Sequence, residues 1–138
     1  MIDRYARKEL KKIWDEKNKY QIWLDIEIAA AQAMEKLKLI PKGVAVKVRK
    51  KANINVDRIH KIESKVHHDV IAFLTSITEK VGPEGRFLHK GMTSSDVLDT
   101  CFNIQLLQAG KIISKDINEL LKVLKNKSLK YKKTVCIG

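Results

Sequence analysis

One stretch of this sequence decides how the chain is organised, and it reads Gly91-Met92-Thr93-Ser94-Ser95-Asp96-Val97-Leu98-Asp99-Thr100. It places three hydroxyl side chains and a carboxylate where a long helical pattern begins. The first turn of a helix has unpaired backbone N–H groups and partial positive charge, so hydroxyls beside it can bind a carboxylate or a phosphate. The same residues can instead serve only to cap the helix, and both interpretations stay open at this point.

The pattern that follows predicts a single long helix from Ser95 to about Lys132. This range holds no proline and one glycine, Gly110. Its apolar residues at helical spacing fall in two groups, Val97, Cys101 and Ile104, and then Ile113, Ile117, Leu120 and Leu124. Such a helix is about 55 Å long. Because a small domain cannot cover its apolar face, we expect it to lie in a bundle with other long helices, supplied by further protein or by copies of this chain.

The residues before this stretch also predict helices. Residues 3–18 form a polar, loosely amphipathic opening segment, and a helix runs from Lys19 to the turn at residues 40–43, where proline and glycine end it. Its expected apolar face consists of Trp23, Ile26, Ala30, Ala33 and Leu37.

A short helix or turn over residues 44–52 comes next, and Asn55 or Asp57 is expected to cap the helix after it. The apolar positions of residues 59–81 include Val66 and are interrupted at residues 66–69, and the run ends at residues 82–85. No segment alternates as a strand does. The fold class is therefore all-α, with a small N-terminal helical domain at residues 1–92 and the truncated start of a helical bundle at residues 93–138.

Composition limits the classes of function. The net charge of +12 over 138 residues permits an anionic partner, yet 23 of the 28 basic residues are lysine and only 6% of residues are aromatic. Specific nucleic-acid recognition favours arginine and stacking aromatics, so a basic nucleic-acid-binding or oligomerisation module is the alternative rather than the leading hypothesis. No apolar run reaches membrane-spanning length and the N-terminus lacks a signal peptide, which predicts a cytoplasmic protein with reduced Cys101 and Cys136.

Two further clusters carry chemistry. His67-His68-Asp69 interrupts an apolar stripe and suggests a metal site, a proton-transfer site or a polar helix junction. Without HExxH or CxxC spacing no metal is predicted, whereas a histidine beside a carboxylate can donate to phosphate or transfer a proton. Arg4-Tyr5 offers a guanidinium and a phenol to anionic oxygens, or is simply a terminal tail. His60 and His89 have no such neighbours in sequence and are expected at the surface.

Together these segments resemble a known family. Asp3-Arg4-Tyr5, Ile40-Pro41-Lys42-Gly43, His68-Asp69-Val70-Ile71-Ala72-Phe73 and the stretch from Gly91 to Thr100 are similar to the N-terminal part of the adenylosuccinate lyases, which belong to the fumarase and aspartase superfamily. The resemblance extends over the whole chain. It implies all-helical homotetramers in which long central helices form a shared bundle and each active site takes residues from three subunits.

The resemblance also implies an activity and a site. Family members eliminate fumarate from adenylosuccinate and from a succinyl-carboxamide ribotide in purine synthesis. They need no metal or organic cofactor, and neither a membrane nor a specific nucleic acid is an expected partner. Arg4 and Tyr5 would contact the nucleotide, His68 would act as a catalytic residue with Asp69 at the phosphate and reacting end, and the Thr93-Ser94 pair would bind succinyl or phosphate oxygens.

The reacting acid and base are expected elsewhere. Relatives take the acid from a Thr-His-Gly motif and the base from a serine on a mobile loop, and residues 134–138 resemble the sequence just before that motif. Residues 1–138 alone are therefore expected to be inactive. A superfamily lyase that acts on argininosuccinate is a second alternative, against which the Arg4-Tyr5 and His68-Asp69 clusters argue.

Overall fold

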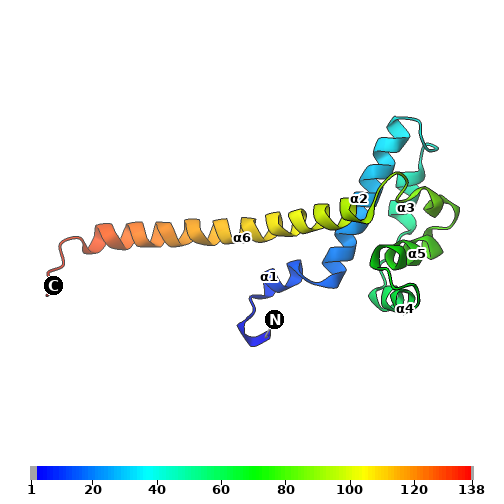
Figure 1. Cartoon of the computed structure of the whole chain (residues 1–138). Coiled ribbons are helices and arrows are strands. Elements are labelled where there is room, and N and C mark those ends of the chain that lie inside the picture. The colour runs from blue at the N-terminus through cyan, green and yellow to red at the C-terminus, as the bar shows by residue number, and fades with distance from the viewer. Residues whose placement is uncertain (1–2, 138) are drawn as a thin grey trace.

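The computed structural model describes residues 3–137, and this range contains helices and turns but no strand (Figure 1). Two short 3-10 helices, η1 (Asp3–Tyr5) and η2 (Pro83–Phe87), accompany the α-helices. These are α1 (Lys8–Ile13), α2 (Glu16–Lys36), α3 (Val44–Lys51), α4 (Val56–Val66), α5 (Asp69–Val81) and α6 (Ser94–Tyr131). The all-α fold class predicted from the sequence is confirmed.

Helix α2 is the centre of the core because α3 and the start of α6 both pack against it. Three fully buried aromatic rings join α2 to α5. The ring centroids of Tyr20 and Phe73 lie 5.8 Å apart in a stacked arrangement, and Trp23 meets the Phe73 ring edge-on at 5.4 Å. Aromatic pairs of this kind contribute about 0.5–1.5 kcal/mol beyond the area they bury. This cluster fixes how the N-terminal helices pack together.

The predicted apolar face of α2 is partly wrong. Trp23 is buried as expected, but Ala33 is exposed and Leu37 is 69% exposed. The helix also begins at Glu16 and ends at Lys36, short of the proline turn, because Lys38 adopts a left-handed conformation with φ of 59°. Neighbours on more than one side bury a broader set, namely Tyr20, Ile22, Trp23, Leu24, Glu27, Ile28 and Ala31.

The break predicted near residues 66–69 separates α4 from α5. Asn55 caps α4, as expected, by accepting a hydrogen bond from the backbone N–H of Arg58 at 2.9 Å. His67 ends the helix with a left-handed φ of 52°, which turns the chain toward α5. Val66 was expected on the buried face, but it is 44% exposed because it lies in the last turn beside this break.

Helix α6 is the predicted long helix, and it starts one residue earlier than expected, at Ser94. Its 38 residues span about 57 Å. Val97, Cys101 and Gln105 are buried. Beyond them the helix keeps side-chain contacts, from Gln108 to Asn18 and from Asp116 to Arg7, and its outer end then extends alone (Figure 1). Nine large apolar side chains stay exposed beyond Gln105: Leu106, Leu107, Ile113, Ile117, Leu120, Leu121, Val123, Leu124 and Leu129.

Candidate active site

The hydroxyl residues at the start of α6 have two different roles in the structure. Thr93 caps the helix, whereas Ser94 has an unpaired hydroxyl within the described residues. Thr93 is the N-cap and forms a capping box with Asp96, whose carboxylate accepts the Thr93 backbone N–H at 2.8 Å. The capping interpretation therefore holds for Thr93 and Asp96. The half-buried hydroxyl of Ser94 has no hydrogen-bond partner among residues 3–137. It lies beside first-turn N–H groups that the helix cannot pair, so it is available to an anion.

His68 and Asp69 start helix α5 in a similar way. Nδ1 of His68 accepts the backbone N–H of Ile71 at 3.3 Å, so His68 is the N-cap. Because Nδ1 accepts, the proton of a neutral ring lies on Nε2. The Asp69 carboxylate is 3.7 Å from Nδ1, too far for a hydrogen bond. The side chain of His68 is 46% exposed, and its ring thus presents an N–H donor to solvent at a helix start.

The Arg4-Tyr5 pair lies on the exposed turn η1. The guanidinium carbon of Arg4 is 4.9 Å from the centroid of the Tyr5 ring, and the tyrosine is 75% exposed. The turn is tied to the long helix because Arg7 forms an ion pair and hydrogen bond with Asp116 of α6. This contact raises the pKa of Arg7 above its usual value. This ion pair connects the residues after η1 to α6 at the surface.

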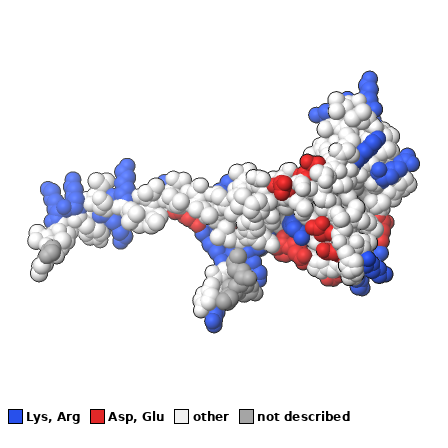
Figure 2. Space-filling model, in the orientation of Figure 1, with Lys and Arg blue, Asp and Glu red and all other residues white. Residues whose placement is uncertain are grey.

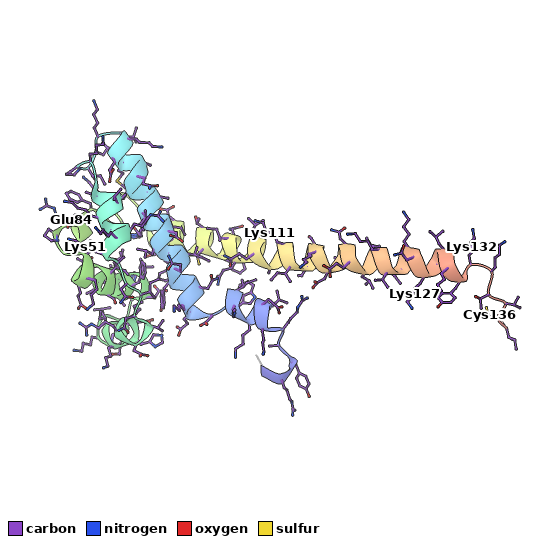
Figure 3. The ribbon with its side chains drawn as sticks, turned by 180° about the vertical axis from the view of Figure 1, so that it is seen from behind. Lys51, Glu84, Lys111, Lys127, Lys132 and Cys136 are labelled. Atoms are coloured by element: carbon purple, nitrogen blue, oxygen red, sulfur yellow. The ribbon has the colours of Figure 1, made fainter. Side chains whose placement is uncertain are left out.

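The Arg4-Tyr5 cluster lies apart from the His68-Asp69 cluster within one chain. In Figure 1 the turn η1 lies well away from α4 and α5, and the view from behind in Figure 3 shows the same separation. No hydrogen bond or ion pair within residues 3–137 connects the clusters at Arg4, His68 and Thr93. A single copy of this part of the protein therefore does not bring the η1 donors to the start of α5.

One feature was missed in the sequence. His89 was expected at the surface without partners, but its side chain is only 18% exposed and its Nδ1 lies 2.7 Å from the carboxylate of Glu27. Glu27 itself is 1% exposed. A signal was present, because Glu27 is the one acidic residue in the apolar run Ile26-Glu27-Ile28-Ala29-Ala30-Ala31. A buried carboxylate needs a nearby donor, and the sequence did not show which one.

Charge and cysteines add little to the site. Lysine and arginine side chains gather on the outer end of α6 and around the edges of the helical domain, as Figure 2 shows. Burial raises the pKa of the Cys101 thiol, which keeps it protonated and unreactive. Within residues 3–137 no group of three or more histidine, cysteine, aspartate or glutamate side chains is arranged to hold a metal ion. No helix described in this range combines the length and apolarity needed to cross a membrane.

Comparison with known proteins identifies the family. A family model described as "Lyase" matches residues 4–138. The chain belongs to this lyase family. It is 44% identical over all of its 138 residues to adenylosuccinate lyase from Thermotoga maritima, and 42% identical over the same length to adenylosuccinate lyase from Streptococcus mutans. The resemblance inferred from the motifs is thereby confirmed.

Solved structures support the same fold. A crystal structure described as fumarate lyase from Mesorhizobium sp. BNC1 superposes with a TM-score of 0.79 at 21% identity, over 86% of this chain and 29% of that one. The chain spans 32% of the length of the two curated lyases.

Proposed function

We propose that this chain forms the N-terminal part of an adenylosuccinate lyase. The observation that carries the proposal is the 44% identity over the whole chain to a protein of that name. The reaction would remove a proton from the carbon beside a succinyl carboxylate. The C–N bond then breaks, its electron pair stays on the departing nitrogen, and that nitrogen takes up a proton. Adenylosuccinate gives fumarate and AMP, and the succinyl-carboxamide ribotide reacts in the same way.

Each exposed donor set suits one part of such a substrate. Arg4 and Tyr5 offer a guanidinium and a phenol to the nucleotide, and His68 with Asp69 would act at the phosphate and reacting end. Thr93 and Ser94 would hold succinyl or phosphate oxygens at the positive end of α6. Fixed donors of this kind stabilise the charge that develops on the carboxylate in the transition state. The active site would need no metal or organic cofactor.

The assembly follows from the same proposal. The separate donor sets would be brought together by copies of the chain in a cytoplasmic homotetramer, whose central bundle covers the exposed face of α6. Residues 1–92 would form the N-terminal domain and residues 93–138 the beginning of the bundle domain. The general acid and base would come from the motifs that follow in relatives, so residues 1–138 alone should release no fumarate from adenylosuccinate.

The test uses the complete protein that contains this chain. Purified wild type should release fumarate from adenylosuccinate, measured by absorbance, with no added metal. Ser94→Ala should raise KM about tenfold or more, since a hydrogen bond to a charged group contributes about 1.5–3 kcal/mol. Ser95→Ala is the matched control, because Ser95 is the next hydroxyl in the same first turn. It should leave KM unchanged.

His68→Gln tests the catalytic assignment in the same assay. Loss of a fixed donor to the charge that develops in the transition state costs about 100-fold or more, so kcat should fall by that factor. A wild-type protein that releases no fumarate from adenylosuccinate would refute the proposed function. A His68→Gln variant with wild-type kcat would remove His68 from the reaction.

A further inference from the structure

Glu27 is a charged side chain in the core, and His89 is its one hydrogen-bond partner among residues 3–137. Its carboxylate is 1% exposed and accepts two hydrogen bonds from His89, which lies 62 residues further along the chain. The backbone N–H of His89 donates to one oxygen at 2.7 Å, and ring Nδ1 lies 2.7 Å from the other. The helix α2 and the connector before α6 are thus joined through these two contacts.

Stability alone explains this arrangement poorly. Taking a carboxylate out of water is unfavourable, and well-packed apolar residues often replace buried ion pairs without loss of stability. The neighbouring positions on α2 are apolar, with Ile28 and Ala31 each 1% exposed. An apolar residue at position 27 would suit this part of the core. The carboxylate instead forms two hydrogen bonds with His89. These bonds suggest that Glu27 fixes the orientation of the His89 ring.

The contact with Glu27 determines which nitrogen of His89 faces outward. An ionised carboxylate only accepts hydrogen bonds, so Nδ1 must carry a proton to pair with it. Nε2 then remains as the free ring nitrogen, and it has no partner among residues 3–137. His89 also has a left-handed φ of 58°, which is uncommon for a histidine and needs support from its surroundings. Glu27 supplies that support.

The position of His89 connects it to the candidate active site. Its carbonyl oxygen accepts the backbone N–H of Met92 at 3.4 Å, which closes a turn directly before the N-cap Thr93. The histidine held by Glu27 therefore lies on the connector that leads to the free hydroxyl of Ser94. A ring fixed at this point can present Nε2 to the same anion that the helix start attracts.

From these contacts we infer that Glu27 is a positioning residue, which holds the His89 ring so that Nε2 faces an anionic oxygen group bound at the start of α6. The inference rests on the proposed function, since it assigns Glu27 to the site that contains Thr93 and Ser94. The bound anion is a carboxylate or a phosphate. Titration with fumarate tests the first and titration with inorganic phosphate tests the second. Glu27 acts through His89 and does not itself touch the substrate.

Glu27→Gln in the complete protein is the sharpest variant because it keeps the size of the side chain. Glutamine has one acceptor oxygen, which the His89 backbone N–H takes, so its amide group faces Nδ1 as a donor. The ring must then move its proton to Nε2 or rotate. We expect kcat/KM for fumarate release to fall about tenfold or more, by analogy with the effect of removing the partner that orients a metal-bound histidine.

A double-variant cycle separates positioning from a structural role. His89→Gln should lose activity to a similar extent, and Glu27→Gln should cause no further loss in the His89→Gln background. Glu16→Gln is the matched control, because Glu16 makes the same kind of contact at the surface, 2.9 Å from Nε2 of His60. The control should keep wild-type kcat and KM. Thermal unfolding of every variant shows whether the fold is intact.

Each outcome decides the inference. Additive losses, an unchanged Glu27→Gln enzyme or an unchanged His89→Gln enzyme would overturn it, and the last result does so even where Glu27→Gln fails to fold. Titration with fumarate and with inorganic phosphate gives a readout independent of turnover. The affinity for one of these anions should fall about tenfold in both single variants and no further in the double variant. A wild type without lyase activity would refute the proposed function, while the anion titrations would still test Glu27.

Discussion

The two ends of α6 differ more than any other two parts of this molecule. Its first three turns contribute Val97, Cys101 and Gln105 to a core shared with α2, and all three are buried. Its outer half has the same helical spacing of apolar residues, yet Ile117, Leu120 and Leu124 are each more than half exposed. One helix thus contains a segment whose apolar side chains this chain buries and a segment whose apolar side chains it leaves exposed. The hydrophobic pattern predicts the helix, while only the structure shows how far along α6 the other helices of this chain pack against it.

The largest expected effect contrasts one residue from each region. Phe73→Ala in the 138-residue chain should lower the free energy of unfolding by about 3–5 kcal/mol, since it removes a ring packed on Tyr20 and Trp23. Leu124→Ala should change it by less than about 0.5 kcal/mol, because this side chain is 54% exposed. Urea unfolding of dilute samples, followed by tryptophan fluorescence, measures both. Equal losses would mean that the outer helix is already packed in the single chain.

A smaller effect is expected at the boundary where α6 begins. Thr93→Ala removes the N-cap of the capping box and should cost about 1 kcal/mol. Ser95→Ala leaves that box intact and should change the stability by no more than about 0.5 kcal/mol. Urea unfolding and amide hydrogen exchange over the first turn measure the two effects. If both variants lost the same stability, the division of roles between capping and free hydroxyls would be wrong.

The fold and the candidate site were predictable to different degrees. The long helix, the helix break near His67 and the cap at Asn55 follow from local pattern and capping chemistry, and the structure has all three. The buried face of α2 did not follow, because the positions of Ala33 and Leu37 depend on which helices pack against α2. Periodicity describes one side of a helix and does not reveal how many sides have neighbours.

The chemistry of His89 shows a related limit. His68 stands beside a carboxylate in sequence, whereas the carboxylate partner of His89 lies 62 residues away and is visible only after folding. A lone glutamate within an apolar run was the available signal. The proposed roles of Arg4, His68, Thr93 and Ser94 come from the family resemblance, because local pattern does not assign a chemical role to these side chains.

The smallest effect concerns pH and the corner between α2 and α3. The Ala45 backbone N–H donates to the carboxylate of Glu35 at 2.6 Å, and this contact lowers the pKa of Glu35. A lowered folded-state pKa gives stability that is present above the unfolded value and is lost as the pH falls through the folded value.

The Tm of wild type should therefore drop more than that of Glu35→Gln between about pH 6 and about pH 3. Thermal unfolding followed by circular dichroism at several pH values makes the comparison. If the Tm of both proteins fell equally with pH, the Glu35 carboxylate would not contribute to the pH dependence of stability.

The most direct measurement addresses what covers the outer half of α6. In the complete protein, Leu120→Asp combined with Leu124→Asp places two charges on the exposed apolar face, and Lys122→Asp provides a control at a position that is already polar. Native mass from light scattering and fumarate release from adenylosuccinate are measured on both variants. The account predicts that the double variant loses the oligomer and the activity together while the control keeps both. A double variant with wild-type mass and wild-type turnover would contradict it.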